Sequence, residues 1–126
     1  MDKIITVEKN EEELPIPHLW RPTFKAIVSS FTKGDYGLST AIKNVNPVSN
    51  DTARQIREYI EDYGEEIIKL PEETWNTSVY FWYGNYWNVL IDLFTKNEGL
   101  SDLVLNAEIR EINHYYVVDI KLVYVS

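Results

Sequence analysis

The chain has 126 residues, of which 44% are hydrophobic and 25% are charged, and its formal net charge is −8. This composition excludes an intrinsically disordered protein and predicts a single soluble domain over residues 1–126. Cysteine is absent, which excludes disulfides and thiolate chemistry and fits a cytoplasmic protein. No apolar run approaches the roughly 18 residues of a membrane span, and the N-terminus shows no secretory signal.

The N-terminal third predicts one short strand and one helix. Residues 1–16 are a candidate edge strand, KIITVE, followed by an acidic loop that contains proline. A helix is predicted from about residue 18 or 21 to Lys33, because Phe24, Ile27 and Phe31 recur at helical spacing. Gly34 is placed to end this helix, and residues 35–50 form a connector.

A second helix is predicted after the connector. Ser49 or Asn50 can cap its start, and Gly64 is placed to end it. An apolar and aromatic stripe runs along one face: Ala53, Ile56, Tyr59, Ile60 and Tyr63. We expect the last four of these side chains to be buried against a sheet.

The remainder of the chain has the period-two alternation of β-strands. It occurs over residues 86–95, 103–111 and 116–124, and the last segment places Leu122 and Tyr124 on the same face as Val118. A further strand, SVYFWY, precedes Gly84-Asn85. A two-residue loop that starts with glycine predicts a type II′ hairpin.

Together these elements predict an α+β fold, with two N-terminal helices packed on a curved four-stranded antiparallel meander. A cone-like curvature is expected because the second face of the sheet is also apolar. That face is predicted to carry Leu90, Phe94, Val104, Val117, Val123 and Val125. Either the curved sheet, the N-terminal segment and the connector cover these side chains, or a partner does.

Catalytic residues are not evident. His18 and His114 lie in separate turns with no cysteine beside them, so neither a metal site nor a cofactor is predicted. Asp92 and Asp119 each lie in the middle of a predicted strand, and they would form a general acid and base only if both lined one cavity. The simpler expectation is that each faces solvent or a basic residue on a neighbouring strand.

Charge is unevenly distributed and predicts the type of partner. Residues 51–73 carry eight acidic against three basic residues, whereas residues 14–50 carry one acidic against four basic residues. Such a chain repels nucleic acid and steers a basic protein towards its acidic part. The predicted partner-binding residues are Glu58, Glu61, Asp62, Glu65, Glu66, Glu72 and Glu73, with Trp75, Tyr80 and Trp82 as aromatic anchors.

Residues 17–126 resemble a family of small, uncharacterised bacterial proteins. The resemblance is carried by WRPTFKAIVSSFTKGDYGL, by IREYIEDYGE with the following LPEETW, and by EGLSDLVL. The family implies no activity and no catalytic residues. In size, charge and style of fold the chain is also similar to the immunity proteins of contact-dependent inhibition systems, although no motif carries that second likeness.

The leading functional hypothesis is therefore a non-enzymatic, acidic immunity protein that neutralises a cognate basic toxin, such as a nuclease, by direct binding. One alternative is a cone-like fold that binds a small molecule, or acts as an enzyme, with Asp92 and Asp119 in its cavity. Another is an accessory domain that only oligomerises. No membrane partner is expected, and the pattern predicts no particular oligomeric state.

Overall fold

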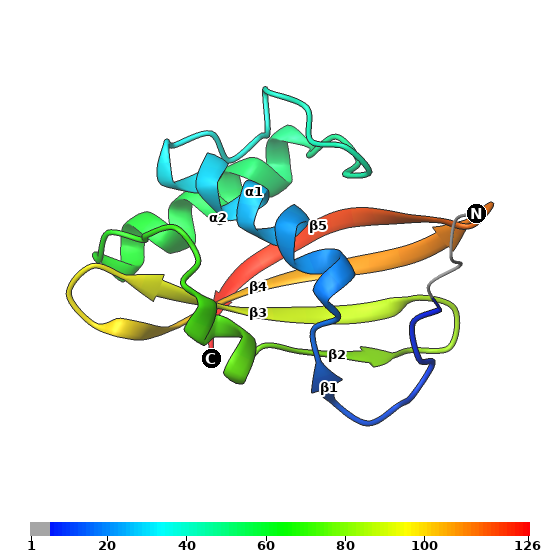
Figure 1. Cartoon of the computed structure of the whole chain (residues 1–126). Coiled ribbons are helices and arrows are strands. Elements are labelled where there is room, and N and C mark those ends of the chain that lie inside the picture. Colours follow the sequence, from blue (N-terminus) through cyan, green and yellow to red (C-terminus); the bar gives the residue numbers. More distant parts are fainter. Residues whose placement is uncertain (1–5) are drawn as a thin grey trace.

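A computed structural model describes residues 6–126. Two α-helices lie on one face of a five-stranded antiparallel sheet with the order β1-β2-β3-β4-β5 (Figure 1). The sheet is open and does not close into a barrel. The elements are β1 (Leu14–Pro15), η1 (His18–Trp20), α1 (Arg21–Thr32), α2 (Asn50–Tyr63), η2 (Glu72–Asn76), β2 (Val79–Trp82), β3 (Trp87–Thr95), β4 (Gly99–Ile112) and β5 (Tyr115–Val125). The α+β class, the two helices and the meander are confirmed, with one additional strand at the edge.

Capping residues mark the start of α2 and the ends of both helices. The Ser49 hydroxyl accepts a hydrogen bond from the Thr52 backbone N–H at 3.1 Å, which caps α2. The helix ends at Gly64, whose φ of 81° is the left-handed conformation that glycine adopts without strain. Gly34 has a φ of 77° just after α1, where the Asp35 N–H bonds back to the Ser30 carbonyl at 3.0 Å.

The burial of α2 differs from the prediction at one position. Ile56 and Ile60 are buried against the sheet and Tyr63 is half-buried, but Tyr59 is 45% exposed. The expectation that Tyr59 is a core residue is therefore wrong. The apolar stripe that packs on β5 is narrower than the sequence pattern, and Tyr59 lies at its edge.

The hairpin turns follow the predicted chemistry. Trp82 pairs with Trp87 across the Gly84-Asn85 loop, and only Gly84 has a positive φ, as the type II′ turn requires. The turn between β4 and β5 is different in kind. Asn113 and His114 have φ values of 50° and 69°, which is the pattern of a type I′ turn.

A β-bulge in β5 reverses the face that its last residues occupy. Asn106 pairs with Leu122 and Ala107 with Ile120, so Lys121 is the extra residue. Beyond the bulge, Val123 is buried in the core and Leu122 is exposed. The prediction that Val123 and Val125 lie on the second face is thus wrong, because one inserted residue shifts the alternation.

The core on the helix side contains a cluster of aromatic rings. Trp20, at the start of α1, makes edge-on contacts with Tyr80 at 5.3 Å, with Trp87 at 5.6 Å and with Tyr116 at 5.7 Å between ring centroids. Such contacts add to the free energy gained from burying these large side chains. The aromatic hairpin β2–β3 is therefore mainly a core element.

Both edges of the sheet are occupied by short segments. The N-terminal edge strand is Leu14–Pro15, not KIITVE; residues 1–5 lie outside the described residues, and Thr6 to Glu8 are not strand. At the other edge, the Gln55 side chain of α2 donates to the Val123 carbonyl at 2.6 Å and accepts from the Val123 N–H at 3.2 Å. This amide takes the place of a neighbouring strand and blocks pairing with other chains.

The connector does not cover the second face of the sheet. Residues 35–50 lie with the helices in Figure 1, where Tyr36, Ile42 and Val48 pack against the core. Val7 and Ile16 of the N-terminal segment are also buried in that core. On the second face Phe94 and Val104 are each 6% exposed, so part of that face is covered. The connector reaches it only at the β5 edge, where the Asn46 side chain donates to Asp119.

Candidate protein-binding site

Most of the predicted acidic residues gather at one end of α2. The acidic end of α2, as we call this group, consists of Glu58, Glu61, Asp62, Glu65 and Glu66. Glu65 is half-buried, and the other members are exposed. Within residues 6–126, none of them forms an ion pair within 4.0 Å.

The two remaining predicted acids lie on η2. Glu72 binds the Lys25 ammonium of α1 at 2.6 Å, and this hydrogen bond lowers the pKa of Glu72. Glu73 is exposed beside it. Because Lys25 neutralises Glu72, the η2 group offers less free negative charge than the acidic end of α2.

Negative charge at the end of α2 opposes the helix dipole. The C-terminal end of a helix carries partial negative charge and favours basic side chains. In α2 no basic residue lies in the last turn, whereas Glu61 and Asp62 do. Glu58 and Asp62 also stand four residues apart on one helix face, which places like charges together. The arrangement lowers the stability of the free protein, and a docked cation would relieve it.

An aromatic groove lies beside these carboxylates. It has a volume of about 350 Å³ and is lined by Tyr59, Asp62, Tyr63 and Val125. Tyr59 is 45% exposed and Val125 49%, so the groove presents apolar surface to solvent. Sequence reasoning missed it, because Tyr59 was expected in the core and Val125 on the second face of the sheet.

Hydrogen bonds hold one wall of the groove in place. The Tyr63 hydroxyl donates to Glu98 Oε2 at 2.8 Å and accepts from the Asp102 N–H at 3.2 Å. These bonds join the last turn of α2 to the start of β4. The Ser126 N–H donates to the Asp102 carbonyl at 2.8 Å, which fixes the end of β5 beside Val125. The groove is therefore formed before any ligand binds.

Two of the three predicted aromatic anchors are core residues. Trp75 is 6% exposed and Tyr80 is 4% exposed, so neither can reach a docking partner without unfolding. The Arg21 guanidinium also covers the Trp75 ring at 5.2 Å. Trp82 is half-buried, with the Lys9 ammonium 5.1 Å from its ring centre. The expectation that Trp75 of η2 and Tyr80 of β2 are surface anchors is therefore wrong, and the role of Trp82 stays a prediction.

The structure does not bring Asp92 and Asp119 into one cavity. Both lie on the face of the sheet away from the helices, but Asp92 pairs with Val104 and Asp119 pairs with Glu108. Four residues of β4 separate these partners, which is about 13 Å along a strand. Asp119 accepts a hydrogen bond from the Asn46 side chain at 2.6 Å. A paired acid and base at these positions has no support in this geometry.

Among residues 6–126, no three His, Asp or Glu side chains are grouped so that they could hold a metal ion. Over the same residues, no helix combines the length and apolar character that crossing a bilayer requires.

Residues 28–126 match a family described as a domain of unknown function (DUF7668). The chain belongs to this family. The DUF7668 match contains α2 and β2 to β5, and so it includes every residue of the aromatic groove. A search of curated proteins and a search of solved structures found no match to the chain. The family confirms the resemblance to an uncharacterised group over most of the chain, and no named relative supports a likeness to immunity proteins.

Proposed function

We propose that this chain is a non-enzymatic binding module whose partner is a basic protein. The supporting observation is the combination of two features at one place. Tyr59 and Val125 are exposed in a groove, the Asp62 carboxylate lines it, and the other carboxylates of the acidic end of α2 lie on the same stretch of chain. Exposed apolar surface gives affinity, and the surrounding charge selects a cationic partner.

A lysine or arginine side chain is the natural occupant of the groove. Its aliphatic stem packs on tyrosine rings and on Val125, while its charged head reaches the Asp62 carboxylate. The exposed carboxylates of Glu58 and Glu61 act at longer range. They raise the rate of association, and the filled groove slows dissociation.

The more specific form of the proposal is an immunity protein that neutralises a basic toxin. A nuclease holds the phosphate backbone of its substrate with lysine and arginine side chains. An acidic protein that occupies those side chains excludes the nucleic acid by competition. This account needs no catalysis by the immunity protein.

The test is co-expression with the product of the neighbouring gene, read out as growth protection and as co-purification. Reversing Glu61, Asp62 and Glu65 to lysine should abolish both. The matched control reverses Glu11, Glu12 and Glu13, which are equally numerous and all exposed but lie beside the opposite edge of the sheet. Protection that survives the first reversal would remove the acidic end of α2 from the interface. If no neighbouring gene product binds, the immunity proposal fails as a whole.

A further inference from the structure

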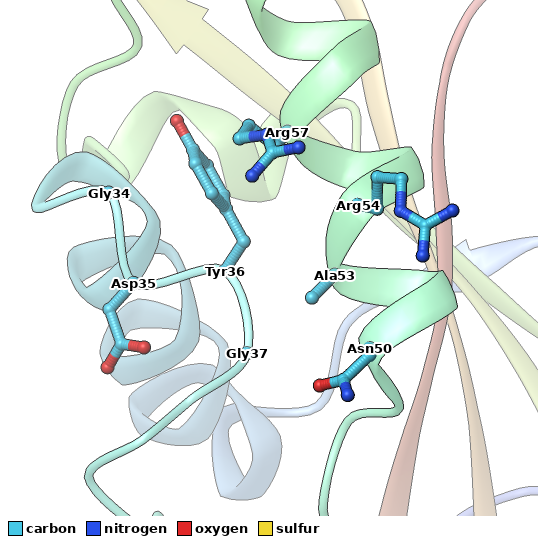
Figure 2. A pocket seen from close by; sticks show the side chains of 8 residues that line it. All are labelled: Gly34, Asp35, Tyr36, Gly37, Asn50, Ala53, Arg54 and Arg57. Carbon is cyan, nitrogen blue, oxygen red and sulfur yellow. The ribbon is translucent and has the colours of Figure 1, made fainter.

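A second pocket lies on the other side of α2 and has the opposite charge character. It has a volume of about 340 Å³ and lies between residues 34–37 and the first half of α2 (Figure 2). Asn50, Ala53 and Arg57 stand on one helix face at positions i, i+3 and i+7. Ala53 and Gly37 are small, and a Cβ built on Gly37 would lie 3.8 Å from that of Ala53. The lack of larger side chains here keeps the pocket open.

Arg57 supplies a positive charge to this pocket, and Glu61, whose charge also acts on Tyr36, lies one turn further along the same helix face. Figure 2 shows its guanidinium directed towards Tyr36, whereas that of Arg54 points to the far side of the helix. Arg54 is paired with Asp51 at 3.2 Å. Within residues 6–126, Arg57 has no ion pair within 4.0 Å. The chain has 20 acidic and 12 basic residues, so an arginine without an ion pair is unexpected.

Asp35 belongs to the pocket wall, but its carboxylate is hydrogen-bonded outside the pocket. The Asp35 side chain points away from the pocket in Figure 2 and accepts hydrogen bonds from the Ser39 N–H at 2.9 Å and 3.1 Å. Leu38 is buried with a φ of 52°, a conformation that a non-glycine residue keeps only when its surroundings hold it. The wall formed by residues 34–37 is thus fixed, and Asp35 does not neutralise Arg57.

Hydrogen-bond donors and one acceptor face the pocket. Arg57 offers a planar fork, and the Asn50 amide offers an acceptor oxygen as well as an N–H₂ donor. Burial, and then the charge of Glu61, raise the pKa of Tyr36, although Arg57 opposes this. The Tyr36 hydroxyl therefore keeps its proton at neutral pH. The positive end of the α2 dipole lies at the same site.

We propose that this pocket binds the phosphate group of a small phosphorylated molecule. A phosphate accepts several hydrogen bonds at once and pairs with the guanidinium fork of Arg57, which is directed towards Tyr36. Asn50 and Arg57 are about 10 Å apart along the helix. That span leaves room for a small organic group beside the Tyr36 ring. The proposal is independent of protein binding at the groove, which lies at the other end of α2.

The experiment is an NMR titration of backbone amides with sodium phosphate and then with glycerol 3-phosphate, at constant ionic strength set by sodium chloride. We expect saturable shifts at residues 34–37 and at Asn50. Arg57→Gln should weaken binding roughly ten- to hundredfold, the loss typical of a charged hydrogen-bonding group. Lys121→Gln removes the same charge from an exposed site on β5 and should change affinity less than about twofold.

A second variant tests the shape of the site without changing charge. Ala53→Leu keeps a good helix former on a half-exposed face and fills the pocket. It should weaken phosphate binding while the amides outside the pocket keep their positions. Absence of saturable shifts, or equal affinity in Arg57→Gln, would overturn the proposal. Equal affinity for acetate would overturn the assignment to phosphate.

Discussion

Replacing Ile60 by alanine tests how α2 lies on the sheet. Ile60 is 6% exposed, so the substitution removes apolar groups from the core. Three lost carbons at about 0.8 kcal/mol each give a transfer loss of roughly 2.4 kcal/mol. The cavity left behind brings the expected cost to about 2–5 kcal/mol. The total stability of a domain is about 5–15 kcal/mol, so the effect is a large share of it.

The control for this prediction is the adjacent position, Tyr59. Its side chain is 45% exposed, and Tyr59→Ala should cost about 1 kcal/mol or less. Urea unfolding followed by circular dichroism gives both values from the transition midpoints, provided that the slopes agree. If Tyr59→Ala costs as much as Ile60→Ala, the helix is rotated about its axis relative to this account. The groove beside Tyr59 would then not exist.

Four further outcomes are expected. Gly84→Val should destabilise the protein more than Asn85→Ala in thermal melts, because only Gly84 has a positive φ of 87°; equal effects would contradict the type II′ turn. Gln55→Ala should cost about 1–2 kcal/mol and speed hydrogen exchange at the Val123 amide, which loses its partner; unchanged exchange would contradict the edge-blocking role. Burial raises the pKa of Tyr36, Tyr80, Tyr116 and Tyr124 above 10.0. The protonated tyrosines therefore stabilise the fold below about pH 10, and this contribution should be lost as the pH rises through their pKa values in the folded state. Tyrosinate absorbance should show this loss as unfolding at alkaline pH. Asp62→Lys should raise the melting temperature of the free protein, since it relieves the helix dipole and the repulsion from Glu58; a fall would contradict that electrostatic analysis.

The parts of the fold that depend on local chemistry could be predicted from the sequence. Ser49, Gly64 and Gly84 mark the start of α2, its end and a hairpin turn, because each satisfies a backbone requirement within a few residues. The alternation along β3 and β4 also gave the correct core faces, since strand side chains point to opposite sides of a sheet.

The burial error at Tyr59 comes from the width of the helical stripe. At about 100° per residue, Tyr59 lies roughly 80° from the midpoint of Ile56 and Ile60, whereas Ala53 and Tyr63 lie roughly 40° from it. Gln55 and Asp62, roughly 40° and 60° from Tyr59 in the direction away from that midpoint, add to the polar character of that side. The angle was available from the sequence, but residue type alone suggested burial.

Other features depend on contacts between distant segments. The bulge at Lys121 has no local sequence signal, yet it moves Val123 into the core and Val125 into the groove. The pairing of Leu14–Pro15 with β2 likewise depends on tertiary packing, because Val7 and Ile16 on either side of this strand are buried in the core. Of the predicted partner-binding residues, the acidic ones lie at the surface, whereas Trp75 and Tyr80 are buried, and binding by the acidic ones stays a prediction.

The central claim is that the acidic end of α2, with its aromatic groove, receives a basic protein. The most direct measurement is the association rate constant for the basic product of the neighbouring gene as a function of salt concentration. The account predicts a rate that falls as salt rises, with that dependence largely lost when Glu61, Asp62 and Glu65 are reversed and retained when Glu11, Glu12 and Glu13 are reversed. An equal loss in both triple variants, or an unchanged salt dependence in the first, would contradict it.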